Sequence, residues 1–332
     1  MKKAFITIVA LFMAATTHSA YASEQIQTVG SSTVYPFATT VAEQFGKSTD
    51  FLTPIIESTG TGGGMKLFCA GVGFKHPDVT NASRPIKKSE QKKCKAAGVT
   101  PIEMKVGYDG IVLAGNKDGI MLNLTRTQLY KATARDVWDG SKFVPNPYKK
   151  WSDIDPSLPD LNIEVLGPPP TSGTRDAYVE LVQHKACKKF GIKKKGPTGD
   201  KVNCSAVRED GRYVEAGEND NLIIQKLGAD KRRYGIFGFS FLDENLDKIQ
   251  GAIIDGKSPT FENIASGSYP ISRGLFFYVK KEHLDGVRGL REYVNFWTSE
   301  AMIGDEGATV EKGLIPLPAA EREKIREMVK GL

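Results

Sequence analysis

The chain has 332 residues, of which 40% are hydrophobic and 25% charged, and its formal net charge is +6. These proportions are typical of a water-soluble globular protein, and the length is enough for two domains. The positive excess suits small anions. The densest basic run, 185–195, holds one aromatic residue and matches no nucleic-acid-binding motif, so we expect no nucleic-acid partner.

The first residues have the pattern of a secretion signal. Lys2 and Lys3 precede an apolar run over 4–15, and a small-residue cleavage site, Ala20-Tyr21-Ala22, follows. The apolar run is too short for a membrane-spanning helix. We therefore predict a cleaved signal peptide over 1–22 and a periplasmic location.

Strand and helix patterns alternate along the rest of the chain. The expected strands are 26–29, 52–57, one ending near 79–82, 104–114, 162–166, 234–241 and 274–280. The expected helices are 34–45, one starting at 65, 88–97, 129–137, 175–187, 221–228, 287–297 and 319–329. Such alternation predicts an α/β protein with mainly parallel sheets.

Four cysteines lie beyond the predicted signal peptide, and three pairings of them are possible. The local pairs Cys69–Cys94 and Cys187–Cys204 are the simplest. Each would stabilise the fold by about 3 kcal/mol by restricting the unfolded chain. A metal site is the alternative, but there is no CxxC pair and the four histidines are scattered. We expect no metal and no cofactor.

Three stretches combine hydroxyl residues with glycines just before an expected helix, namely 30–33, 60–64 and 171–175. A helix N-terminus offers unpaired N–H groups and the positive end of the helix dipole. Added hydroxyl or guanidinium donors make it suited to an anion. Any one stretch could be an ordinary helix cap, but the three together predict a protein that closes around one small oxyanion.

Two enzymatic alternatives find little support. The glycine-rich stretch fails the Walker A spacing, because Met65 precedes Lys66 and Leu67 replaces the hydroxyl residue. No Gly-x-Ser-x-Gly elbow is present, and no histidine lies within a few residues of a hydroxyl stretch. A hydrolase whose Ser and His meet only in space stays open, but we do not expect an enzyme.

Two arginines adjoin the hydroxyl stretches. Arg84 follows Ser83, and Arg175 follows Thr174 at an expected helix start. A guanidinium offers a planar, two-pronged donor for an oxyanion. Because an arginine at a helix N-terminus opposes the dipole, its position favours a bound anion between them. The alternative is a salt bridge from Arg175 to Asp176 or another carboxylate.

Four motifs in this order resemble the periplasmic phosphate-binding proteins of the high-affinity phosphate ABC importers, and the resemblance covers nearly the whole chain after residue 22. The motifs are Val29-Gly-Ser-Ser-Thr-Val-Tyr-Pro36, Gly60-Thr-Gly-Gly-Gly64, Asn81-Ala-Ser-Arg-Pro-Ile86 and Gly167-Pro-Pro-Pro-Thr-Ser-Gly-Thr-Arg-Asp176. The resemblance implies a receptor that captures inorganic phosphate and delivers it to a membrane ABC permease and its ATPase. The alternatives are a receptor for sulfate, molybdate or a phosphonate, and a secreted phosphatase on a similar fold.

The same resemblance implies a two-lobed periplasmic binding protein fold of the type II kind and a monomer. Each lobe would be a mixed, mainly parallel sheet flanked by helices, and two strands, near 108–113 and 270–277, would cross between the lobes. Lobe I would comprise 23–110 plus 275–332, and lobe II 111–274. By motif position, the implied phosphate ligands are Ser32, Thr33, Thr61 and Ser83 of lobe I and Ser172, Gly173 and Thr174 of lobe II.

The chain departs from the family pattern at two positions. Some members carry an aspartate where this chain has Arg84, and an arginine where it has Pro168. That aspartate accepts the proton of hydrogen phosphate, which sulfate lacks. Our hypothesis is that Arg84 and Arg175 supply the missing charge and that Asp109, in the first crossing strand, accepts the proton. The alternative is that Asp109 is a hinge carboxylate bound to backbone.

Overall fold

The computed structural model describes residues 23–190, 203–217 and 220–332. The predicted signal peptide over 1–22 lies outside the described residues, as does the end of the basic run, 193–195. Within the described ranges, no helix combines the length and the hydrophobicity needed to cross a bilayer.

One lobe is built from both ends of the described chain. Its N-terminal elements are β1 (Gln27–Gly30), α1 (Tyr35–Ser48), β2 (Ile55–Ser58), α2 (Gly60–Phe68), β3 (Val79–Ala82) and α3 (Lys88–Ala96). Its C-terminal elements are β13 (Ser272–Lys280), a 3₁₀ turn (Lys281–His283), α11 (Leu290–Trp297), α12 (Glu300–Ile303), a second 3₁₀ turn (Val310–Lys312) and α13 (Ala319–Lys330). The long strand β4 (Pro101–Asn116) leaves this lobe and enters the other.

The other lobe is made of the intervening chain. Its first elements are β5 (Asn123–Leu124), α4 (Arg126–Thr133), β6 (Asp136–Trp138), β7 (Phe143–Pro145), α5 (Trp151–Ile154), β8 (Val165–Gly167), α6 (Gly173–Tyr178), a π-helix (Val179–Gln183) and α7 (His184–Lys189). The remaining ones are β9 (Tyr213–Glu215), α8 (Asp220–Ala229), β10 (Tyr234–Gly238), α9 (Phe239–Asp243), β11 (Ile249–Gly251), β12 (Ile253–Ile254) and α10 (Phe261–Ala265).

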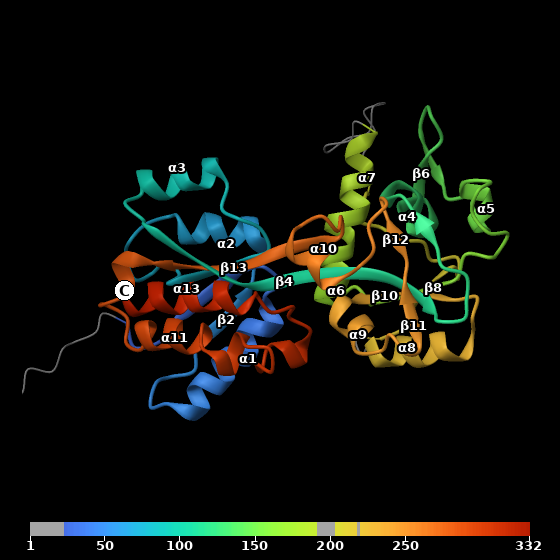
Figure 1. The fold of residues 1–332 in the computed structure, drawn as a ribbon. Coiled ribbons are helices and arrows are strands. Elements are labelled where there is room, and N and C mark those ends of the chain that lie inside the picture. The colour runs from blue at the N-terminus through green and yellow to red at the C-terminus, as the bar shows by residue number, and fades with distance from the viewer. Residues whose placement is uncertain (1–22, 191–202, 218–219) are drawn as a thin grey trace, which may run out of the picture.

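A single mixed sheet runs through both lobes in the order β2-β1-β3-β13-β4-β10-β8-β9, and β11 also pairs with β4. The outer strands pair in parallel, whereas β3, β13, β4 and β10 pair antiparallel. Residues 101–110 of β4 face β13, and residues 111–115 face β10. In the ribbon, the two groups of helices lie toward opposite ends of β4 (Figure 1). The sequence-based prediction of a two-lobed α/β fold is confirmed.

Two large hydrophobic clusters hold the helices to the sheet. One lies in the lobe formed by the chain ends, where Trp297 stacks on Phe277 with ring centroids 4.3 Å apart. The other lies mainly in the second lobe, where Trp151 packs edge-on against Tyr234 at 5.6 Å, and it extends to Ile315 and Leu317 near the C-terminus. Since each cluster buries its own aromatic residues, each lobe has a separate source of hydrophobic stabilisation.

Most of the expected elements are present, and helix α1 shows why. Its apolar residues recur at helical spacing and form one buried face, and Pro36 lies in its first turn, where a missing N–H costs nothing. Three expectations were wrong in part. Helix α2 begins at Gly60 rather than at Met65, residues 136–138 form a strand, and residues 239–243 form a helix.

The local pairing of the cysteines is confirmed. The bond Cys69–Cys94 joins the end of α2 to α3, and Cys187–Cys204 joins α7 to the segment that follows it. All four cysteines are therefore used in disulfides, so none of them is free to ligate a metal.

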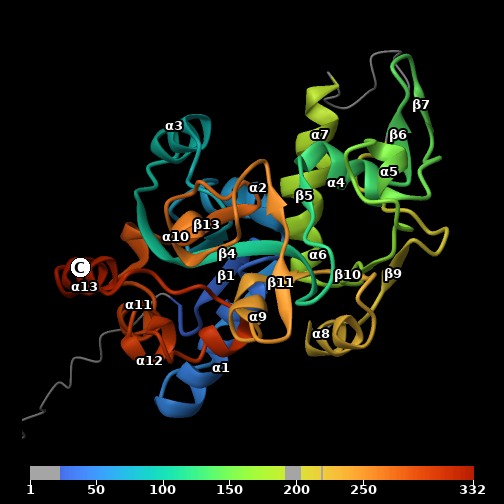
Figure 2. The ribbon, with the colours of Figure 1, turned by 45° about the vertical axis from the view of Figure 1, so that its right-hand side comes forward.

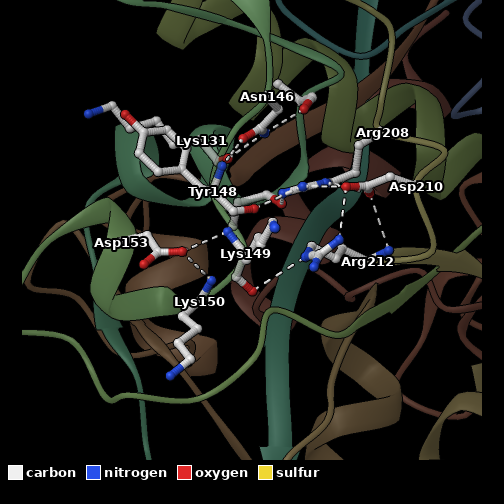
Figure 3. A network of polar contacts seen from close by, with 11 residues as sticks. Lys131, Asn146, Tyr148, Lys149, Lys150, Asp153, Arg208, Asp210 and Arg212 are labelled. Atoms are coloured by element: carbon white, nitrogen blue, oxygen red, sulfur yellow. Dashed lines mark hydrogen bonds and ion pairs between the residues drawn. The ribbon is translucent and has the colours of Figure 1, made fainter.

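A buried arginine organises the irregular part of the second lobe (Figure 3). Arg208 is 3% exposed and donates to the carbonyl oxygens of Ala132 at 3.2 Å and Tyr148 at 2.9 Å. It also forms a two-pronged pair with Asp210, at 2.8 and 2.6 Å. Arg212 donates to the backbone carbonyl oxygen of Lys149 at 3.4 Å. The end of α4, the loop before α5 and the segment before β9 are thus tied together by charge-assisted bonds.

This network predicts acid sensitivity. The hydrogen bond from Arg208 holds the pKa of Asp210 at about 2, below its ordinary value of 3.8. A lowered folded-state pKa stabilises the protein above the unfolded value, and the contribution is lost as the pH falls toward 2. We therefore expect Asp210→Asn to be less stable than the parent near neutral pH and to lose less stability between about pH 5 and about pH 2.

Urea denaturation at a series of pH values measures this difference. The matched control is Asp247→Asn, whose carboxylate is exposed and lies 3.9 Å from Lys248. It should keep the parent's pH profile. Parallel profiles for Asp210→Asn and the parent would contradict the assignment.

Candidate functional site

The first two hydroxyl stretches meet at the carboxyl ends of β1 and β3. Gly30 ends β1 with a φ of 130°, which only glycine adopts easily. A Cβ there would lie 2.2 Å from the carbonyl oxygen of Asn81, so the two strands approach too closely for any side chain. Residues 31–34 then turn into α1. The glycine therefore allows the hydroxyl stretch to lie directly against β3.

The glycine-rich stretch is the first part of α2 rather than a loop before it. A Cβ on Gly64 would lie 2.5 Å from the Cα of Gly30, so the helix packs with its backbone on the end of β1. This contact explains why the helix continues through residues of poor helix propensity. It also places Thr61 beside Ser83, whose backbone N–H donates to the Thr61 hydroxyl oxygen at 3.2 Å.

A cavity of about 600 Å³ lies between the two lobes and is lined by residues of both. Figure 2 shows α2 and α3 on one side and α6 and α7 on the other, with β4 running between them. The lining residues are Ser31, Ser32, Thr33, Gly60, Thr61, Gly62, Ser83, Arg84, Lys87, Pro170, Arg175, Asp176, Val179, Glu180, His184 and Ser205. The wall is rich in hydroxyl groups and carries charges of both signs.

Six of the predicted site residues line this cavity: Ser32, Thr33, Thr61, Ser83, Arg84 and Arg175. Ser172, Gly173 and Thr174 of the third stretch are not among the lining residues. The Ser172 hydroxyl caps α6 by accepting from the Thr174 N–H at 3.2 Å. A Cβ on Gly173 would lie 3.4 Å from the carbonyl oxygen of Ser32 and 3.6 Å from the Cα of Thr33. The first and third stretches are therefore in van der Waals proximity.

Arg175 is buried and held by its own lobe. Its Nη1 donates to the carbonyl oxygen of Pro168 at 2.8 Å and to the Tyr213 hydroxyl at 2.9 Å. The guanidinium also lies 4.8 Å from the centre of the Tyr213 ring, and its Nη1 lies 3.7 Å from a carboxylate oxygen of Glu215. The two hydrogen-bonded partners are neutral, and the salt-bridge alternative is met by Glu215, whose side chain is 48% exposed.

Arg84 lines the cavity with its charge already paired. Its two terminal nitrogens form a two-pronged bond to Glu90, at 2.8 and 2.9 Å. The hypothesis that Arg84 supplies free charge to an anion therefore needs this pair to loosen. The six-residue spacing of Arg84 and Glu90 gave no clear signal in the sequence, because Arg84 precedes α3 and Glu90 lies in its first turn.

Arg273 was not predicted as a site residue from the sequence. This residue of β13 faces Asp109 of β4 in the antiparallel register, and its Nε donates to the Asp109 carboxylate at 3.2 Å. Burial raises the pKa of Asp109, and the charge and hydrogen bond of Arg273 offset only part of that effect. The carboxylate contacts a guanidinium rather than the backbone partner of the alternative hypothesis. Antiparallel pairing of the two expected crossing strands was the signal that could have revealed Arg273.

Comparison with known proteins identifies the class. A two-lobed α/β fold with a polar cavity between the lobes is the architecture of substrate-binding proteins, and the profile of the PBP superfamily domain matches residues 15–301. The chain is 33% identical to Protein SphX of Synechococcus elongatus, over 87% of this chain and 77% of that protein. It is 30% identical to the phosphate-binding protein PstS of Staphylococcus saprophyticus, over 87% of this chain and 79% of that protein.

A solved structure is also similar to this chain. The crystal structure of a possible phosphate-binding protein from Planctomyces limnophilus aligns with a TM-score of 0.76 and 30% identity, covering 93% of this chain and 98% of that one. The chain therefore belongs to the PBP superfamily and, within it, to the family of PstS and SphX.

The close approach of β1 and β3 can be tested by substitution. Gly30→Ala places a Cβ against the Asn81 backbone at a positive φ, so we expect it to destabilise the protein by more than about 1 kcal/mol. Gly62→Ala is the control, because nothing lies within 4 Å of its Cβ and its φ is ordinary for a helix. It should be neutral or stabilise by up to about 1 kcal/mol. Urea denaturation of both variants measures the contrast, and equal midpoints would contradict it.

Proposed function

We propose that this protein captures inorganic phosphate in the cavity between its lobes and delivers it to a membrane ABC permease driven by an ATPase. The observation that carries the proposal is the cavity wall, in which hydroxyl groups beside two helix starts face a buried arginine of the other lobe. Such donors suit a small tetrahedral oxyanion. The names of the relative PstS and of the Planctomyces limnophilus protein support phosphate as that anion.

In this proposal Ser32, Thr33, Thr61 and Ser83 donate from one lobe, and Arg175 gives charge from the other. The third stretch, Ser172 to Thr174, contributes N–H groups and hydroxyls once the lobes close. Arg84 contributes charge if its pair with Glu90 loosens. Since the donors come from both lobes, the ligand favours the closed state.

The moving bodies are the predicted lobes, 23–110 plus 275–332 and 111–274. Support comes from the two separate hydrophobic clusters and from β4 and β13, which join them. A pair of neighbouring strands can bend as a hinge between two bodies. The protein would act as a periplasmic monomer and break no bond.

A secreted phosphatase is the second candidate, and one contact favours it. His184 Nε2 lies 2.9 Å from the Ser205 hydroxyl, and both residues line the cavity. A serine beside a histidine is the arrangement of an activated nucleophile. The contact is at the exposed mouth of the cavity, away from the hydroxyl stretches, which favours the receptor.

Calorimetric titration tests the proposal. After removal of any carried anion, we expect phosphate to bind with a Kd of about 1 μM or tighter, and sulfate, molybdate and methylphosphonate to bind far more weakly. A chromogenic phosphate ester incubated with the same preparation should release no product. Absence of heat with phosphate would end the main proposal, and ester hydrolysis that is lost in Ser205→Ala would favour the phosphatase.

The proposed role of Asp109 concerns the choice between phosphate and sulfate. A buried carboxylate can accept the proton of hydrogen phosphate but repels sulfate, which has none to donate. Asp109→Asn can donate instead, so we expect the ratio of phosphate to sulfate affinity to fall at least about tenfold. The ratio is the right measure, because the substitution also weakens the pair with Arg273.

Titration of both anions into parent and variant gives the ratio. The control is Asp118→Asn, an exposed carboxylate 3.0 Å from Lys231, which should leave it unchanged. If Asp109→Asn still does not bind sulfate and binds phosphate as tightly as the parent, Asp109 has no part in the selection of phosphate over sulfate.

A further inference from the structure

The guanidinium of Arg273 donates to acceptors from three separate parts of the chain, one bond from each of its three nitrogens. Nε donates to Asp109 of β4 at 3.2 Å, Nη2 to the Thr33 hydroxyl at 2.6 Å, and Nη1 to the Glu180 carboxylate at 2.6 Å. The side chain is only 8% exposed. Arg273 therefore links the start of α1, a crossing strand and the π-helix of the other lobe.

Two of these three partners stand between Arg273 and the cavity. Thr33 and Glu180 line the cavity, and both accept from Arg273, which is not itself among the lining residues. The Glu180 side chain is 50% exposed, so its carboxylate is free to move toward solvent. A carboxylate in the wall of an anion site repels the ligand. The Glu180 carboxylate is compatible with anion binding if it moves away when the anion binds.

The contact with Thr33 sets the direction of that hydroxyl. Because Nη2 donates to the Thr33 oxygen, the hydroxyl proton is free to point elsewhere, and Thr33 borders the cavity. Arg273 thus makes Thr33 a donor toward the cavity even before an anion binds.

We propose that Arg273 is a second cation, beside Arg175, that recognises the charge of the anion, and that Glu180 is an internal competitor which the anion displaces from Nη1. The inference rests on the proposed function and deepens it. A tethered carboxylate competes at high effective concentration, so a monovalent ion such as chloride fails to displace it. A doubly charged oxyanion with several acceptor atoms succeeds. Glu180 would therefore exclude abundant weak anions from the site.

The affinity of the parent is lowered by the fraction of molecules in which Glu180 has left Arg273. If that fraction is about a tenth, Glu180→Gln should bind phosphate about tenfold more tightly. The matched control is Glu164→Gln, a partly exposed carboxylate of the same lobe that pairs with Arg233 at 2.8 Å outside the cavity. It should change the affinity by less than about twofold.

Two further measurements separate competition from a structural effect. The double variant Arg273→Lys/Glu180→Gln should bind phosphate less than about twofold more tightly than Arg273→Lys alone, because the gain in affinity requires the guanidinium. If Arg273→Lys does not fold, chloride gives an independent answer. Replacing gluconate by chloride at constant ionic strength should weaken phosphate binding more in Glu180→Gln than in the parent.

The outcomes are distinct. Phosphate binding by the parent with an unchanged or weaker affinity in Glu180→Gln overturns this inference and leaves the proposed function intact. Equal chloride sensitivity of the parent and Glu180→Gln also overturns it. A parent that does not bind phosphate at all ends the proposed function, and the inference with it.

Discussion

The antiparallel pairing of β4 with β13 is the constraint on which the rest of the structure depends. The two strands pair from Pro101 to Gly110 and carry the sheet from one hydrophobic cluster to the other. Their register sets Asp109 opposite Arg273 at the floor between the lobes. The pair of strands that joins the lobes therefore also carries two charged residues of the proposed anion site.

The sequence predicted the elements whose stabilisation is local. Helix α1 has an apolar face and a proline in its first turn, and both signals lie within a few residues. The prediction from the sequence was wrong where a contact between residues far apart in the chain decides the structure. Helix α2 starts at Gly60 because Gly64 packs on Gly30, which no propensity of the glycines themselves indicates. Residues 136–138 form a strand because β7 pairs with them.

The candidate site divides in the same way. The hydroxyl stretches could be found from composition alone, since Ser, Thr and Gly before a helix have a direct physical meaning. The charges could not, because their effect depends on partners. Arg84 is paired with Glu90, Arg175 with two neutral acceptors and Glu215, and Arg273 with groups from three distant segments. Only the folded register decides which arginine can respond to an anion.

The strand order also has a consequence for folding. In the part of the chain that the structure describes, strands β1, β2 and β3 join the rest of the sheet only through β13, whose residues 272–280 are made near the end of synthesis. The N-terminal part of the sheet must therefore wait, with β3 unpaired on one side, until almost the whole chain exists. Contacts so distant in sequence form slowly. If the predicted signal peptide directs export, this delay would help to keep the polypeptide unfolded until it has crossed the membrane.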